Sequence, residues 1–220
     1  LFWHEQGVER IVLARELSLA EIKQMRSKLP QSLELEMFIH GAMCISYSGR
    51  CLLSNYLNGR DSNRGECAQP CRWKYEIREK GSNGEFFTME QDEKGTFIMN
   101  SRDLRLIEYL PEVIDAGIMS LKIEGRMKSI AYVATVVNAY RMALDEYSRS
   151  QELGIPYKVP ELVMKELELA SHRPYTTGFA FGEPGPGGQE TGAGGYISDG
   201  AIAAVVQAYD AESKIATIAQ

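Results

Sequence analysis

The sequence predicts an α/β fold that resembles the later part of a β/α (TIM-like) barrel, with an inserted cysteine loop and a small β module at its end. Short β-branched apolar runs alternate with amphipathic segments, which is typical of βαβ units around a parallel sheet. All four cysteines lie in one loop, residues 41–75. After Pro174 the helical period disappears. We therefore expect a partial barrel domain over residues 1–174 and the start of a β-rich module over 175–220.

The chain before the cysteines predicts a strand, a helix and a second strand. Ser18 and Glu21 form an S-x-x-E capping box, in which each side chain satisfies an unpaired backbone donor at the start of the helix. An alternating apolar run predicts the second strand, which ends at His40 and Gly41. In order, these three segments are residues 10–15, 18–29 and 33–39.

The chain after the cysteine loop predicts a hairpin, further strands and three helices. Ser101 or Asp103 caps the first helix and Gly117 ends it. A second hairpin with its turn at residues 210–213 is expected near the end of the chain. The expected strands are residues 73–78, 85–89, 96–100 and 118–123, and the expected helices are residues 102–116, 128–148 and 160–170.

Composition and charge limit the classes of protein that this chain can belong to. The 220 residues are 44% hydrophobic, which is enough to bury a core. The net charge of −6 argues against a general nucleic-acid coat protein. No apolar run has the length of a membrane span, so we expect no membrane partner. The chain starts at Leu1 and stops inside an alternating apolar run, so we expect a fragment, which a homo-oligomer could cover at its exposed sheet edge.

The clustered cysteines indicate a soft metal centre, because thiolates gathered by one loop suit zinc or an iron–sulfur cluster. Six, fifteen and three residues separate Cys44, Cys51, Cys67 and Cys71. Two disulfides would suit a small scaffold in an oxidising compartment, and inert buried thiols would be scattered rather than clustered. Zinc sites favour a C-x-x-C pair, which is absent, and the uneven spacing suits a cluster better. Spacing alone leaves the choice between zinc and a cluster open. Free cysteines would place the protein in the reducing cytoplasm.

Three motifs resemble one known family, the collagenase-like peptidases, whose catalytic type is unassigned. The motifs are FIHGAMCISYSGRCLLSNYLNGRDSNRGECAQPCRWKYEI, SLKIEGRMKS and RPYTTGF. The resemblance covers nearly the whole chain, and the cysteine block is highly specific. Within the family, the sequence is most similar to bacterial members needed for forming 5-hydroxyuridine in transfer RNA.

The resemblance implies a 4Fe-4S cluster on Cys44, Cys51, Cys67 and Cys71, with transfer RNA as the partner. It also implies prephenate or a related small carboxylate metabolite as the source of the hydroxyl group, or oxygen by a separate route. We therefore expect an iron–sulfur-dependent factor for tRNA uridine hydroxylation.

Two other functions remain open from the sequence. The first is a peptidase that acts on collagen-like chains, as the family name says. The sequence has neither a G-x-S-x-G elbow nor an H-E-x-x-H helix, and a cysteine nucleophile paired with His40 would leave three cysteines unexplained. The second is a non-catalytic RNA-binding scaffold in which a cluster or zinc only holds the loop together.

The remaining candidate residues lie at strand ends, where β/α barrels carry their reactive groups. We expect His40, Glu124 and Arg126 to be catalytic, with Glu124 as an acid–base group and Arg126 as an anion clamp. Alternatively, His40 is a core histidine, and Glu124 and Arg126 form a structural ion pair. Cationic and aromatic residues of the loop predict contacts to RNA or to a substrate carboxylate, although the arginines could instead pair with carboxylates. These predicted binding residues are Arg60, Arg64, Arg72, Trp73 and Lys122.

Overall fold

The computed structural model describes residues 1–44, 46–73, 76–77, 87–88, 101–184, 188, 197 and 204–219. Helices and strands alternate along most of this part of the chain. The helices are α1 (Phe2–Glu5), α2 (Leu19–Arg26), α3 (Leu53–Asn58), α4 (Leu110–Asp115), α5 (Ile130–Leu153) and α6 (Glu161–Leu169), with short 3-10 helices η1 (Ser62–Arg64), η2 (Pro70–Arg72) and η3 (Ile107–Tyr109). The strands are β1 (Arg10–Val12), β2 (Glu34–Ala42), β3 (Glu76–Ile77), β4 (Phe87–Thr88), β5 (Asp103–Arg105), β6 (Ser120–Ile123), β7 (Tyr175–Thr176), β8 (Val205–Asp210) and β9 (Ile215–Ala219).

The main sheet is built around β2. Strands β1 and β6 both run parallel to β2, whereas β5 pairs antiparallel with the last residues of β2. Strand β7 then pairs parallel with β5. The mixed α/β class is confirmed, with mostly parallel pairing. The described strands follow the open path β1–β2–β5–β7, with β6 beside β2, and the barrel stays a prediction.

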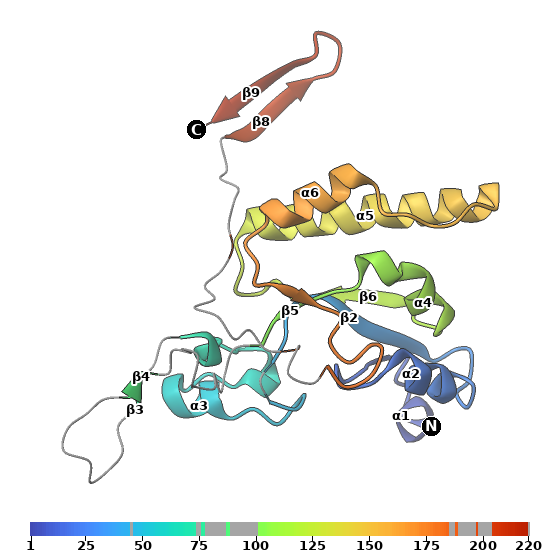
Figure 1. Ribbon diagram of the computed structural model, residues 1–220, viewed down its shortest axis with the longest axis vertical. Helices are drawn as coiled ribbons and strands as arrows, with labels where there is room; N and C mark the ends of the chain where they lie inside the picture. Colours follow the sequence, from blue (N-terminus) through green and yellow to red (C-terminus); the bar gives the residue numbers. More distant parts are fainter. Residues whose placement is uncertain are drawn as a thin grey trace.

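The core is formed by one face of β2 and by a row of helices in which each helix packs against the next. Leu35, Met37 and Ile39 alternate along β2 and are buried in the core cluster that also holds Ile22 of α2 and Val136 of α5. Helix α2 packs against α4, α4 packs against α5, and α5 and α6 lie side by side (Figure 1). Side chains of β2 and β6 pack against this helical layer in the apolar core.

The capping box predicted at Ser18 and Glu21 is confirmed, with the hydroxyl of Ser18 accepting from the Glu21 N–H. Helix α5 is capped by Ser129 and ends at Gly154, in the left-handed region with φ of 65°. Helix α6 and the antiparallel hairpin β8–β9, with its turn after Asp210, were also predicted correctly.

The predicted helix over residues 102–116 was wrong in its first half. Residues Asp103–Arg105 form β5 instead, because Leu104 is buried when this segment pairs with β2. Helix α4 begins only at Leu110, and Pro111 lies in its first turn, a position where proline is favoured. The strand predicted over 96–100 lies outside the described residues, and of the first predicted hairpin only β3 and β4 are described, paired antiparallel.

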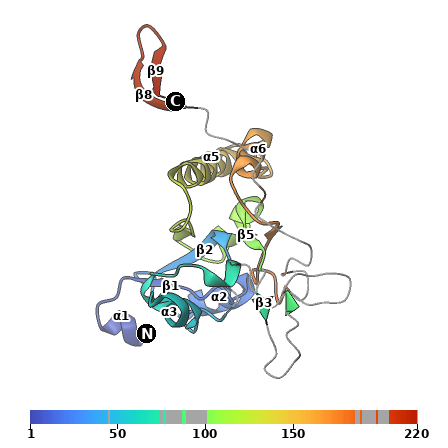
Figure 2. The ribbon, with the colours of Figure 1, turned by 90° about the vertical axis from the view of Figure 1, so that its left-hand side faces the viewer.

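The last part of the chain divides into two pieces. Strand β7, which we assigned to the C-terminal module, pairs with β5 in the main sheet, and Ala180 after it lies in the core. The hairpin β8–β9 lies apart from the main sheet in both views, and its side chains from Val206 to Ile218 are exposed (Figures 1 and 2). A separate module beyond residue 174 stays a prediction. In the described part of the chain, no helix combines the length and the apolar character needed to span a membrane.

Candidate functional site

The ends of β2, β5 and β6 meet at one edge of the sheet. The backbone N–H of Glu124, just after β6, donates to the carbonyl of His40 at 2.9 Å. Gly41 has φ of +103°, and a Cβ atom there would lie 2.4 Å from the Glu124 carbonyl oxygen. Asp103 pairs with Ala42 because β5 runs antiparallel to β2, so it is the start of β5 that reaches this edge. The ends of β2 and β6 therefore converge with the start of β5, because β5 runs in the opposite chain direction.

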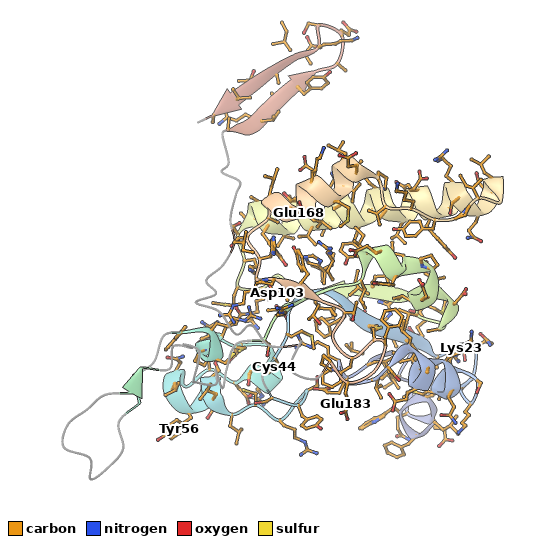
Figure 3. The ribbon with its side chains drawn as sticks, viewed as in Figure 1. Lys23, Cys44, Tyr56, Asp103, Glu168 and Glu183 are labelled. Atoms are coloured by element: carbon orange, nitrogen blue, oxygen red, sulfur yellow. The ribbon has the colours of Figure 1, made fainter. Side chains whose placement is uncertain are left out.

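All four cysteines line one cavity of about 620 Å³ at this edge. None of them is in a disulfide. Figure 3 shows Cys44 where the cysteine segment leaves the sheet. Within the described residues, no three His, Cys, Asp or Glu side chains form a group that could hold one metal ion. The four thiols thus share the wall of one cavity. The cavity also contains Arg15, Arg72, Glu124 and Arg126.

The cysteines differ in their electrostatic surroundings. Burial raises the pKa values of Cys44 and Cys71, and neighbouring Arg15 and Arg72 respectively oppose this rise. Burial also acts to raise the pKa of Cys51, but hydrogen bonds from the Leu53 N–H and from nearby serines outweigh it and lower that pKa. The surroundings of Cys51 therefore favour its thiolate, the form that binds metals, whereas burial disfavours the thiolates of Cys44 and Cys71.

Hydrogen bonds hold the cysteine segment in shape. The hydroxyl of Ser54, which is fully buried in α3, accepts from the Ala68 N–H at 3.0 Å. Cys67 accepts a hydrogen bond at its sulfur from the Gln69 N–H at 3.2 Å. Gln69 has φ of 54°, a left-handed conformation that is uncommon for a residue other than glycine. A strained turn beside a thiol is a feature that often accompanies functional sites.

A buried ion pair fastens this segment to the sheet. Arg72 Nη1 lies 3.0 Å from Asp103 Oδ1, and the two side chains are 5% and 0% exposed. Arg72 also donates to the Met43 carbonyl, and Asp103 accepts from the Arg173 N–H. Asp103 lies between the cysteine segment and the α5–α6 layer in Figure 3. Arg72, which we predicted as a contact to RNA, is therefore placed to hold the loop.

Arg15 is a residue of the cavity that the sequence analysis did not single out. Its guanidinium donates to the Ala42 carbonyl at 2.6 Å and lies 4.4 Å from the centre of the Phe38 ring. The adjacent carboxylate of Glu16 accepts from the Ser48 N–H at 2.8 Å, which ties the segment between Cys44 and Cys51 to the loop after β1. In the sequence, the only indication that Arg15 lies in the cavity was its position at the end of the first predicted strand.

Glu124 and Arg126 both lie in the cavity, as their positions after a strand predicted. The Glu124 carboxylate accepts from the Arg126 N–H at 3.2 Å, so it caps its own turn. The Arg126 side chain approaches Gly65, where a Cβ atom would lie 3.1 Å from Nη1. Lys122 does not line the cavity. It pairs with Glu36 at 3.2 Å and is 42% exposed.

His40 lies in the core rather than in the cavity. It is buried among the rings of Tyr132, Tyr140 and Tyr175, and its Nε2 atom has no hydrogen-bond partner in the described part of the chain. Burial, with help from nearby cations, lowers its pKa to about 3. A neutral histidine away from the cavity agrees with the core interpretation and not with the catalytic one.

A second, smaller cavity lies behind the cysteine segment. It has a volume of about 400 Å³ and includes Trp73 and Lys128. Trp73 is 50% exposed, and burial lowers the pKa of Lys128 to about 8. Of the other predicted RNA contacts, Arg64 is exposed, Arg60 is partly buried, and neither lines this cavity. The structure brings Trp73 together with a lysine that the sequence analysis missed.

Comparisons with known proteins place these features in a family. The model of peptidase family U32 matches residues 1–190. The chain is 44% identical over 220 residues to the tRNA hydroxylation protein P1 of Bacillus subtilis, covering all of this chain and 50% of that protein. It is 38% identical to the tRNA hydroxylation protein P of Escherichia coli (81% of this chain, 46% of the relative) and 33% identical to a collagenase of Porphyromonas gingivalis (67% and 36%). No solved structure matches the chain. The chain spans about half the length of the tRNA hydroxylation proteins that it matches.

Proposed function

Since the chain belongs to peptidase family U32, we propose that it is part of an iron–sulfur-dependent factor that hydroxylates a uridine of transfer RNA. The names of the Bacillus and Escherichia relatives support tRNA hydroxylation. The observation that carries the proposal is the single cavity lined by Cys44, Cys51, Cys67 and Cys71. One bound group accounts for all four thiols, and a 4Fe-4S cluster takes four cysteine ligands.

The residues of the cavity fit such a group. Four free thiols around about 620 Å³ offer the ligands, and the buried Arg72–Asp103 pair fixes the segment that carries Cys67 and Cys71. When bound, a cluster would supply single-electron transfer. We propose these four cysteines as its ligands, in a cytoplasm that keeps their thiols reduced.

The cations in the same cavity suit a small carboxylate metabolite of the prephenate type. Arg126 and Arg15 both line the cavity, and a guanidinium binds a carboxylate through paired hydrogen bonds. Glu124 lines the same cavity as the thiols and Arg126, and its carboxylate could accept or return a proton there. We also propose that the rest of the longer protein completes the open sheet into a β/α barrel, which would explain why the reactive groups gather at strand ends.

The peptidase function is the second candidate, because the chain is similar to a protein named collagenase. A cysteine peptidase needs a base beside its nucleophile. His40, the histidine that we considered for this role, does not line the cysteine cavity. The geometry therefore favours the cluster over a cysteine–histidine pair.

The test is mass spectrometry of transfer RNA from cells that lack the gene and carry the wild-type or a variant gene. We expect 5-hydroxyuridine to return with the wild type and to be lost with Cys44→Ala, Cys51→Ala, Cys67→Ala and Cys71→Ala alike. Lys165→Gln is the control, because Lys165 is exposed and forms an ion pair with Glu161 of its own helix. Immunoblotting verifies that each variant accumulates. Loss with one cysteine variant alone would support a nucleophile and contradict the cluster.

A further inference from the structure

The cavity behind the cysteine segment has the features of a nucleotide site. It is lined by Gln69, Trp73, Lys128, Ser129, Tyr132 and Ser171, among others, and its volume is about 400 Å³. Trp73 is 50% exposed, although it directly follows the ordered turn η2, whose carbonyl of Pro70 accepts from its N–H at 2.9 Å. An aromatic ring held by backbone hydrogen bonding and open to solvent is suited to stacking a base.

A cation lies in the same cavity. Lys128 is held in place by a hydrogen bond from its Nζ to the Ser171 carbonyl at 2.8 Å and lies over the Tyr132 ring at 4.9 Å. Burial lowers its pKa to about 8, and Arg72 and Arg173 act in the same direction against Asp103. At neutral pH the ammonium group of Lys128 therefore remains mostly charged. Because it is partly buried, an anion that binds beside it would stabilise this charge. A phosphate is an anion that such a point charge binds.

The two cavities share a wall. Gln69, Arg72 and Met127 line both of them, so the second cavity adjoins the cavity that the cysteines line. A ligand in the second cavity would therefore lie next to the proposed reaction site without occupying it. This position suits the part of an RNA that neighbours the modified uridine.

We propose that this cavity binds one unpaired nucleotide of the RNA substrate, with its base on Trp73 and its phosphate at Lys128. The proposal rests on the proposed function, because it assumes an RNA substrate. It adds a location and two contacts to that function. Stacking on an aromatic ring tolerates every base, so the site would hold the RNA strand and leave the choice of uridine to other contacts.

The experiment measures the affinity of the full-length protein for a fluorescein-labelled oligouridylate and for unmodified transfer RNA over a series of salt concentrations. We expect Trp73→Ala to weaken binding about 10-fold without changing the salt slope. We expect Lys128→Gln to weaken binding and to reduce the slope of log K against log salt by about 0.7, the value for one contact to single-stranded nucleic acid. Lys128→Arg keeps the charge and should keep the slope.

Two control variants match these changes. Tyr56→Ala removes an aromatic residue that is 85% exposed on α3 of the same segment, and Lys165→Gln removes an exposed lysine of α6. Neither should change affinity or slope. If the wild type binds RNA and all variants bind it equally tightly, the nucleotide site is overturned and the proposed RNA function is not. Absence of binding by the wild type to either RNA would overturn the RNA function and this site with it.

Discussion

Replacing Asp103 by alanine tests whether the cysteine segment is held by the buried ion pair. The variant removes a carboxylate that is 0% exposed and lies 3.0 Å from the Arg72 guanidinium, itself 5% exposed. At an effective dielectric constant of about 20, the lost Coulomb attraction at this distance is about 5.5 kcal/mol. Experiments in which one partner of a buried pair is removed give losses of about 3–5 kcal/mol, because the other charge stays buried without compensation. We expect Asp103→Ala to lower the free energy of unfolding by this amount.

Urea denaturation measures this loss, with the free energy extrapolated to water. The matched control is Asp145→Ala, which breaks an ion pair of similar length, 2.7 Å to Arg141, between side chains that are 66% and 60% exposed. Exposed pairs contribute less than about 1 kcal/mol, so this variant should remain close to the wild type. The double variant Arg72→Met, Asp103→Leu should recover much of the loss, because neither charge of the pair is then left buried without the other. Equal effects of Asp103→Ala and Asp145→Ala would refute the role of the pair.

Two further predictions concern the strand that leads to the cysteines. Gly41→Ala should lower the free energy of unfolding by more than about 2 kcal/mol, because a left-handed residue with a Cβ is strained and this Cβ meets the Glu124 carbonyl at 2.4 Å. Gly154→Ala, also left-handed but with open space around it, should cost only about 1 kcal/mol in the same urea titration, and equal losses would disprove the contact. For His40, the folded pKa of about 3 lies below the unfolded value of about 6.5, so protonation favours the unfolded state and the stability present above pH 6.5 is lost on acidification. His40→Gln should therefore reduce the loss of stability between pH 6.5 and pH 4 by about 3 kcal/mol, and a slope unchanged from the wild type would show that His40 titrates normally.

The sequence predicted the parts of the fold that depend on local signals. The capping box at Ser18 and the stop of a helix before Gly117 act within one helical turn, and both were found, with Gly117 at φ of 89° just after α4. The segment at Asp103 was misassigned, because a short strand that pairs antiparallel with β2 is set by a distant partner and not by its own periodicity. Pro111 was the available signal that the helix begins later.

The same distinction applies to the site. Clustering of the cysteines along the chain predicted their gathering in space, since a single loop carries them. The position of the His40 ring in the core could not be predicted, because a histidine at a strand end looks the same in sequence whether its ring points into a cavity or into the core. Arg15 and Lys128 were missed because they enter the two cavities from segments far along the chain, and only tertiary packing brings them there.

The most direct test of the account is the iron and acid-labile sulfide content of the full-length protein purified without oxygen, measured together with its visible absorbance. The account predicts four iron and four sulfide per chain, and loss of both in each of the four variants Cys44→Ala, Cys51→Ala, Cys67→Ala and Cys71→Ala. A colourless wild-type protein with one zinc per chain would contradict the account. So would a cysteine variant that keeps the full iron and sulfide content of the wild type.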